Sequence, residues 1–446
     1  MKRLVACIIL LAAAAPSIVP TAAVAAPRRP NVVIVMLDDV RADLITPEAA
    51  PTITNRVMGR GVVFGRAIVP VSLCCPSRAS TLTGNHAHTT GVYKGIGTFR
   101  DDRTVAVWLD DAGYRTGLFG KYLNGYGRGR WAGYVPPGWD RWTAFRQPGF
   151  TGYDWFDRAG RLHAGTRYST AFLVRRAKRF IRSTPRRAPL FLYFAPYTVH
   201  EPTEPAPRDV GAFAHLEPWR PPSYDVDPHQ QPPYLDREWT PAQAAQVDDR
   251  RIAQHETLLS ADRAVGTILD ALARTGRRRD SVVIVMSDNG FMWGEHRLTG
   301  KNAPYDTSSR IPLALRYDTA GWTGSRAGVV ANIDLAPTIA RLTHVDHPAT
   351  EGVSLLPMLR TGSGVRDALL LEHKGAGGPE SIPSFCGVRT RHHLFVHYTD
   401  GFEELYDYRV DPWELDNIAR DDPGFTATFR RRTRELCDPV PPGFAW

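Results

Sequence analysis

A continuous apolar run, NVVIVML at Asn31–Leu37, ends directly in the acidic pair Asp38-Asp39. It is rich in β-branched residues, a pattern typical of a strand buried on both faces of a sheet. Two more runs share this character: LFLYF at residues 190–194, and SVVIVM at residues 281–286, which is followed by Ser287-Asp288-Asn289-Gly290. We therefore predict three buried strands, two of which end in acidic or amide side chains.

Helical patterns separate these runs. We expect helices over residues 104–111, 171–183 and 241–274, the last begun by Thr240 and stopped by Gly276. Strands that alternate with helices predict an α/β fold with a mostly parallel sheet flanked by helices. Such sheets bind ligands beyond the carboxyl ends of their strands, which is where the acidic pairs fall.

The chain changes character near residue 360. Short β-like runs at 368–371, 393–398 and 403–408 precede a helical segment at 425–437. We predict a large domain over residues 27–360 and a small C-terminal α+β domain with an antiparallel sheet over residues 361–446. The proline-rich segment 201–241 is expected to run over the surface and to form one wall of the functional site.

Residues 1–26 have the layout of a secretory signal peptide, with two early cations, an apolar stretch and small residues before Pro27. A membrane anchor is the alternative, but Pro16 and Pro20 interrupt the apolar stretch, which is shorter than the roughly 20 residues of a span. We expect cleavage near Ala26 and a secreted chain without stable membrane insertion.

The composition is that of an ordinary globular protein: 446 residues, 43% hydrophobic and 23% charged, with a formal net charge of +9. Removal of the two leader cations would leave +7, a mild excess that suits an anionic substrate. The arginines gather only in short groups such as residues 277–279 and 430–432, and no nucleic-acid-binding motif accompanies them. We interpret these groups as solvated helix ends and predict no nucleic-acid partner.

The chain contains five cysteines. Cys7 lies in the leader, and in an exported chain Cys386 and Cys437 are candidates for a disulfide across the C-terminal region. Cys74 and Cys75 are adjacent, so a bridge between them would be strained. No second pair stands at zinc-ligand spacing, which argues against a zinc site.

The two strand-end pairs, Asp38-Asp39 and Asp288-Asn289, offer only oxygen ligands, the kind that Ca²⁺ or Mg²⁺ prefers. Either pair alone is equally well explained as a helix cap or a turn former. Together, at the ends of two buried strands, they predict a site for one hard divalent cation.

The most specific segment is Cys74-Cys75-Pro76-Ser77-Arg78, which continues as ASTLTG to Gly84. Pro76 suits the first turn of a helix, so Cys74 is expected at a helix N-terminus, where main-chain amides favour an anion. The alternative is a buried structural cysteine, which would not require proline, serine and arginine at these offsets.

This segment resembles the signature of the sulfatase family: cysteine, any residue, proline, serine and arginine, followed by leucine, threonine and glycine. The resemblance covers nearly the whole mature chain, through Asp38-Asp39, Gly120-Lys121-Tyr122-Leu123-Asn124, residues 287–290, Gly294-Glu295-His296, Gly300-Lys301 and Glu404-Leu405-Tyr406-Asp407. Within the family the pattern is most similar to N-acetylglucosamine-6-sulfatases and their heparan-sulfate relatives. It implies an alkaline-phosphatase-like fold with residues 27–360 as the catalytic domain.

The resemblance also implies a division of roles. Cys74 would be oxidised by a formylglycine-generating enzyme to formylglycine, which as a hydrated aldehyde attacks the sulfur of a sulfate ester. The modified Cys74 would bind the metal beside Asp38, Asp39, Asp288 and Asn289. Arg78 would hold the hydrated aldehyde, Lys121 and Lys301 would neutralise the sulfate oxygens, and His200 would contact or protonate the leaving oxygen.

One position departs from the family pattern. Many sulfatases carry a histidine two residues after the lysine of Gly120-Lys121, and here that residue is Leu123. The base that regenerates the aldehyde is therefore open, with Asn124, His296 and His88 as candidates and His296 ranked above His88. Aromatic residues between positions 129 and 155 could stack on sugars or pack within their own loop, and none enters the predicted site.

We therefore predict hydrolysis of organic sulfate esters, with sugar sulfates of the glucosamine 6-sulfate type as candidate substrates and Ca²⁺ or Mg²⁺ as the metal. Two alternatives stay open. One is a phosphonate or phosphate ester hydrolase of the same superfamily, and the other is a secreted glycan-binding protein without catalytic activity.

Overall fold

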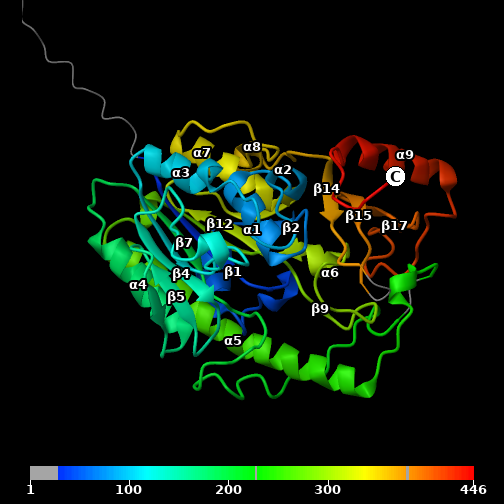
Figure 1. Cartoon of the computed structure of the whole chain (residues 1–446), viewed down its shortest axis with the longest axis horizontal. Coiled ribbons are helices and arrows are strands. Elements are labelled where there is room, and N and C mark those ends of the chain that lie inside the picture. The colour runs from blue at the N-terminus through cyan, green and yellow to red at the C-terminus, as the bar shows by residue number, and fades with distance from the viewer. Residues whose placement is uncertain (1–28, 227–228, 378–380) are drawn as a thin grey trace, which may run out of the picture.

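The computed structural model describes residues 29–226, 229–377 and 381–446 (Figure 1). The predicted signal peptide, residues 1–26, lies outside the described residues. None of the helices in the described ranges is long and apolar enough to cross a membrane.

An eleven-stranded mixed sheet forms the centre of the molecule, in the order β11-β2-β12-β8-β1-β7-β3-β4-β5-β6, with β13 paired to β2. Its central strands are parallel: β8 (Ser281–Ser287), β1 (Asn31–Leu37), β7 (Leu190–Ala195), β3 (Arg115–Gly120) and β4 (Arg141–Gln147). The three predicted strands are β1, β7 and β8, and all of their residues are buried. The predicted α/β class is confirmed.

The edges of the sheet are mostly antiparallel. On one side lie β5 (Asp154–Asp157) and β6 (Leu162–Ala164), and on the other lie β12 (Leu313–Tyr317), β2 (Val62–Ile68), β11 (Arg310–Ile311) and β13 (Gly324–Ala331). The pairing of β13 with β2 is parallel. These strands were not predicted, because polar or small residues interrupt several of them and β2 has an exposed glycine at its centre.

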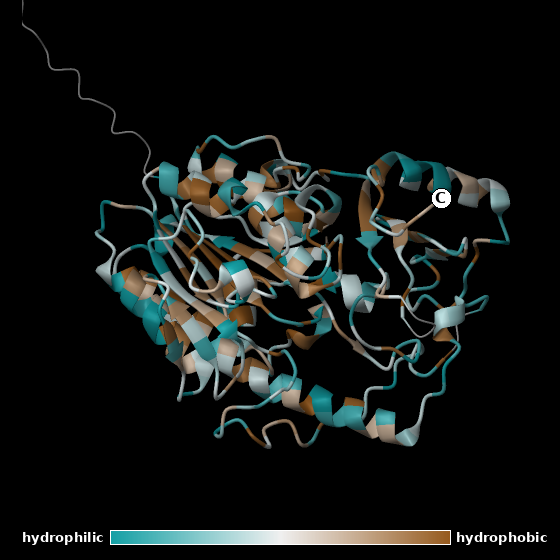
Figure 2. Ribbon diagram, viewed as in Figure 1, coloured by the Kyte–Doolittle hydropathy of each residue, from teal (hydrophilic) through white to brown (hydrophobic). Residues whose placement is uncertain are grey.

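Helices cover both faces of the sheet, and Figure 2 shows apolar strands between helices whose outer sides are hydrophilic. Val33, Val35 and Leu37 pack against α4 (Ser169–Ser183) and α5 (Pro241–Arg274). Val32, Ile34 and Met36 belong to the opposite core, with α1 (Cys74–Thr83), α3 (Val105–Asp111), α7 (Leu335–Thr343) and α8 (Leu356–Thr361). Because successive strand residues face opposite sides, β1 needs an unbroken apolar sequence. The helix α5 begins and ends as predicted, with a capping box at Thr240.

A second, antiparallel sheet follows, in the order β14 (Ala368–His373), β15 (Phe385–Thr390), β16 (His393–Tyr398) and β17 (Glu403–Asp407). The closing helix α9 (Pro423–Leu436) packs against it. The predicted disulfide is confirmed, since it joins Cys386 of β15 to Cys437 just after α9. The strand β15 itself was not predicted.

Candidate active site

The carboxyl ends of β1, β7 and β8 meet at one edge of the sheet. Asp38 N donates to Thr198 O at 2.7 Å, and Asp288 N donates to Leu37 O at 3.1 Å, so the chain stays paired just beyond the strands. Asp39 has a φ of 62°, in the left-handed region that few residues other than glycine adopt. This sharp turn lets two consecutive aspartates take part in the same site.

The four predicted oxygen ligands lie together and are buried. Asp39 N donates to Asp288 Oδ1 at 3.1 Å, and Asn289 Nδ2 donates to Asp39 Oδ1 at 2.8 Å. The buried Oδ1 of Asn289 has no hydrogen-bond partner among the described residues. An unpaired amide oxygen beside the carboxylates of Asp38, Asp39 and Asp288 fits a hard divalent cation such as Ca²⁺ or Mg²⁺.

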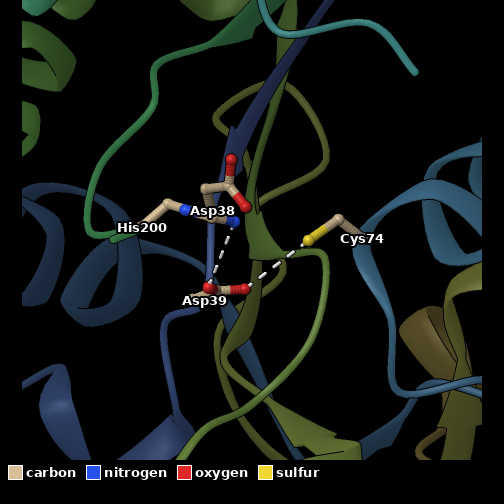
Figure 3. A group of neighbouring side chains, drawn as sticks. All are labelled: Asp38, Asp39, Cys74 and His200. Atoms are coloured by element: carbon tan, nitrogen blue, oxygen red, sulfur yellow. Dashed lines mark hydrogen bonds and ion pairs between the residues drawn. The ribbon is translucent and has the colours of Figure 1, made fainter. Parts of the chain in front are cut away.

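Cys74 and His200 border the same space, as Figure 3 shows. Possible ligand atoms of Asp38, Asp39, Cys74 and His200 all lie within 4.8 Å of one another. The distance from Cys74 Sγ to Asp39 Oδ1 is 3.7 Å, and that from His200 Nε2 to Asp39 Oδ2 is 3.8 Å. His200 Nδ1 lies 2.6 Å from Glu201 O, so Nδ1 carries a hydrogen and Nε2 faces the site.

Cys74 is the first residue of α1, and Pro76 lies in the first turn, as predicted. Lys301 Nζ donates to Cys74 Sγ at 2.8 Å. Burial raises the pKa of the Cys74 thiol, although Lys121 and Lys301 oppose the shift. Cys75 belongs instead to the core, where its thiol donates to Asn124 O at 3.8 Å and burial raises its pKa to about 12. The two neighbouring cysteines therefore have different surroundings.

Three cations, of which Arg78 and Lys121 are buried and Lys301 is partly exposed, balance the three carboxylates. Arg78, fully buried, donates from Nε to Asp288 Oδ2 at 2.7 Å and from Nη1 to Lys121 O at 2.9 Å. Lys121 Nζ lies 2.7 Å from Asp38 Oδ2, and Lys301 Nζ donates to Asp39 Oδ1.

These contacts determine the pKa values of the aspartates. Burial disfavours the charged form of Asp38, but Lys121 and Arg78 hold its pKa well below the usual range. Burial and Asp38 raise the pKa of Asp288, and Arg78 opposes the shift. The ion pairs thus favour the charged form of Asp38, whereas burial and Asp38 disfavour the charged form of Asp288.

Gly120 allows Lys121 to approach the end of β7. Its φ is 127°, and a Cβ at this position would lie 1.8 Å from Ala195 O. Lys121 N donates to that same carbonyl at 2.8 Å. Only glycine fits such a close approach of two main chains.

The candidates for the second base occupy different places. Leu123 is buried in the core, and Asn124 is exposed. His296 is buried against Tyr305, with ring centroids 4.4 Å apart, and its Nε2 lies 3.9 Å from Glu414 Oε2. His88 lines a cavity beside Lys301, and its two ring nitrogens lie against Glu372 and Glu351. The order of the two histidines as candidate bases therefore stays a prediction.

A cavity of about 870 Å³ opens beside Lys301. Its described lining contains no carboxylate, and its polar and cationic residues include His88, Lys94, Asn124, Arg237, Lys301, Asn302 and Lys374. Lys94 and Lys374 were not predicted, because neither belongs to a motif and only the fold brings them together. Of the proline-rich segment expected to form a wall, Arg237 lines this cavity.

Most aromatic residues between positions 129 and 155 are buried, whereas Tyr134 is 39% exposed. Trp139 stacks on Phe191 with centroids 5.5 Å apart, and Trp142 donates from Nε1 to Tyr126 Oη at 2.7 Å. Both indoles are buried, which leaves neither free to stack on a sugar.

A family model described as Sulfatase matches residues 30–345, well over half of the chain. The chain belongs to the sulfatase family. A second model, described as N-sulphoglucosamine sulphohydrolase, C-terminal, matches residues 294–438. The predicted family is thereby confirmed.

Several curated sulfatases are similar in sequence. Human N-acetylglucosamine-6-sulfatase is 28% identical, over 88% of this chain and 81% of its own length. A putative extracellular sulfatase Sulf-1 homolog of Caenorhabditis elegans is 29% identical over 74% of this chain, and an extracellular sulfatase SULF-1 homolog of Drosophila melanogaster is 28% identical over 78% of it. The chain spans about half of the first of these two (49%) and a third of the second (33%).

Solved structures share the fold. A protein in complex with its substrate D-glucosamine-2-N,6-O-disulfate superposes with a TM-score of 0.82 at 22% identity, over 93% of this chain and 99% of the other. The phosphonate monoester hydrolase of Agrobacterium radiobacter gives a TM-score of 0.71 at 20% identity, over 92% and 95%. The fold is the alkaline-phosphatase-like fold predicted from the sequence.

Proposed function

We propose that this protein hydrolyses sulfate esters with a nucleophile made from Cys74. The observation that carries the proposal is the position of Cys74 Sγ, at the first residue of α1 and 2.8 Å from Lys301 Nζ. Free amides at a helix N-terminus and a lysine beside them stabilise a tetrahedral oxyanion. Membership of the sulfatase family supports this assignment.

The unmodified thiol is a poor nucleophile in this site. Burial raises its pKa, so the reactive thiolate is scarce at neutral pH. Oxidation of Cys74 to formylglycine by a formylglycine-generating enzyme replaces the thiol with an aldehyde whose hydrate attacks sulfur. This partner is needed during maturation only.

A divalent cation fits between Asp38, Asp39, Asp288, Asn289 and the modified Cys74. When bound, it would polarise the hydrated aldehyde and a sulfate oxygen. Because three carboxylates already balance three cations, the added charge makes the site attractive to an anionic ester. The oxygen donors favour Ca²⁺ or Mg²⁺.

The side chains around Cys74 would have separate roles in catalysis. Arg78 orients the hydrated aldehyde from its fixed position against Asp288. Lys121 and Lys301 stabilise the charge that develops on the sulfate oxygens, and His200 protonates the leaving oxygen from Nε2. The fixed Nδ1 contact of His200 with Glu201 O supports this orientation of its ring.

The substrate that we propose is a sugar sulfate of the glucosamine 6-sulfate type. The similarity to human N-acetylglucosamine-6-sulfatase supports it, as does a cavity of about 870 Å³ with cationic lining and no carboxylate among its described residues. A sugar with its sulfate group fits a space of this size.

We further propose that the chain is secreted, with a signal peptide at residues 1–26, a catalytic domain at 27–360 and a C-terminal domain at 361–446. The disulfide between Cys386 and Cys437 supports an oxidising compartment.

Mass spectrometry of the peptide that contains Cys74 tests the nucleophile, after expression beside a formylglycine-generating enzyme. We expect the mass of formylglycine, whereas an unmodified thiol would favour a glycan-binding protein without activity. The variant Cys74→Ala should abolish turnover, and the control Cys75→Ala should largely retain it. Equal loss in both variants would contradict the assignment.

The similar fold of the phosphonate monoester hydrolase makes that activity the second candidate. A panel of aryl sulfate, glucosamine 6-sulfate and phosphonate monoesters distinguishes the two. Higher catalytic efficiency on the phosphonate would refute the sulfatase activity proposed here.

A further inference from the structure

Positive charge is concentrated in two short segments that the active site does not use. Residues 171–187 contain seven lysine and arginine side chains and no carboxylate, and residues 274–279 contain four arginines. The formal net charge of the full chain is +9, so the remainder of the chain is net negative. These two segments therefore carry more positive charge than the net charge of the whole chain.

The fold turns most of these cations outward on one surface. Leu173, Ala177, Phe180 and Ile181 of α4 are buried in the core. The exposed Arg175, Arg179 and Arg182 follow one another at helical spacing, and the exposed Arg186 and Arg187 come just after the helix. The fifteen residues of α4 extend over roughly 22 Å, and α5, which packs against it, ends at Arg274. The outward side of α4 is hydrophilic in Figure 2. We call residues 175, 179, 182, 186, 187 and 274 the arginine surface.

This surface leads into a cavity of about 230 Å³. Its described lining includes Arg29, Arg186, Arg187 and Arg277, with Asp280 as the acidic residue. Asn31, the first residue of β1, also lines it, so the cavity lies at the amino ends of the strands. The seven residues of β1 separate it from Asp38 by roughly 23 Å.

Unpaired cations surround this cavity. Arg277 is 4% exposed, and its two Nη groups donate to Asn31 Oδ1, Ala188 O, Thr184 O and Pro185 O at 2.7–3.0 Å, so it contributes charge rather than free hydrogens. Neither it nor Arg29, Arg186 or Arg187 forms an ion pair with a carboxylate within residues 29–226, 229–377 and 381–446. Burial and the nearby Arg186 lower the pKa of Arg277. The exposed Arg187 side chain makes no hydrogen bond or ion pair within the described residues, so its charge faces the cavity without a partner. A bound anion would neutralise this positive charge.

We propose that the arginine surface binds a sulfated polysaccharide chain, with one sulfate group in the cavity beside Arg187. Guanidinium groups bind the oxygens of sulfate through paired hydrogen bonds. No aromatic ring lines the described cavity, whereas sites for single-stranded nucleic acid use rings to stack bases. The choice of a glycan rests on the proposed function, and the site would hold a polymer on the enzyme away from the residue being hydrolysed.

Binding to an immobilised heparin oligosaccharide tests the proposal without any turnover. The double variant Arg182→Ala/Arg187→Ala removes two charges whose side chains make no hydrogen bond or ion pair within the described residues. The matched control, Arg431→Ala/Arg432→Ala, removes two exposed charges from α9. At about 0.15 M salt we expect affinity to fall roughly tenfold in the first variant and less than twofold in the second.

Equal losses in the two variants would overturn the proposal, because net charge alone would then explain binding. Equal affinity of the protein for duplex DNA and for heparin of the same length would overturn the assignment to a glycan. Hydrolysis of a small aryl sulfate should be the same in both variants and in the parent. If the parent hydrolyses no sulfate ester but binds heparin through Arg182 and Arg187, the proposed activity fails and this site stands.

Discussion

His88 offers a direct test of the electrostatics beside the large cavity. Its Nδ1 lies 3.2 Å from Glu372 Oε2, and its Nε2 lies 3.0 Å from Glu351 Oε1. Because ionised carboxylates only accept hydrogen bonds, both ring nitrogens carry hydrogens and the ring is charged. Burial opposes this charge, but the two glutamates raise the pKa of His88 from 6.5 to about 10.

The magnitude follows from this shift. Each pKa unit corresponds to about 1.4 kcal/mol, which sets an upper limit of about 5 kcal/mol for the stabilisation. The Glu351 side chain is 34% exposed, so solvent screening reduces the value to roughly 2–3 kcal/mol. Since the folded-state pKa lies above the unfolded value, the stabilisation is complete below pH 6.5 and is lost as pH rises through about 10.

Urea unfolding of the parent and of His88→Gln measures this contribution. We expect the difference in unfolding free energy to shrink by about 2 kcal/mol between pH 6.5 and about pH 9.5. His215→Gln is the control, because His215 pairs with Glu48 at 3.1 Å where both side chains are more than half exposed. Such a pair contributes little at any pH. A difference for His88→Gln that stays constant with pH would refute the charged state inferred for His88.

Three further changes should have distinct effects. Arg78→Lys keeps the charge but loses the planar group that donates to Asp288. We expect kcat on a sulfate ester to fall roughly 100-fold or more, with an unchanged circular dichroism spectrum. An unaltered kcat would exclude a role for the guanidinium. Ca²⁺ at about 100 times its Kd should raise the unfolding free energy of the chelator-treated protein by about 2.7 kcal/mol. The variant Asn289→Ala should gain less at the same Ca²⁺ concentration. An equal gain in this variant would show that Asn289 is not a metal ligand. Cys386→Ser/Cys437→Ser removes the disulfide that closes a loop with a sequence separation of 51. The unfolding free energy measured in urea should fall by about 4 kcal/mol. A change below about 1 kcal/mol would show that α9 docks without the disulfide.

The strands of the fold differ in how well their sequences predict them. The runs that form β1, β7 and β8 are apolar at nearly every position because helices cover both faces of the central sheet. β15 has the sequence FCGVRT, whose glycine and arginine break any such pattern. Its burial comes from β14, β16 and α9, and the disulfide ties it to the chain just after α9. Local pattern therefore identifies the centre of the sheet and misses the strands that tertiary contacts stabilise.

The same distinction applies to the site. Asp38 and Asp288 were predicted as neighbours because parallel strands bring their carboxyl ends to one edge. The order of His296 and His88 as candidate bases stays a prediction, because the partners that hold each ring could not be read from the sequence. His296 turns toward Tyr305 and Glu414, whereas the glutamates that hold His88 come from residues more than 260 positions away. Long-range partners of this kind leave no local signal.

Charge balance connects the buried residues of the proposed site to its selectivity. Asp38, Asp39 and Asp288 are matched by Arg78, Lys121 and Lys301, so these six side chains sum to zero. Burial makes any net charge costly, which explains why carboxylates and cations occur in equal number. A divalent cation would then create the positive excess that an anionic ester requires. Affinity of the site for sulfate should accordingly depend on the metal. The residues of the arginine surface form no ion pair with a carboxylate within the described residues, so this surface should bind its anion with or without metal.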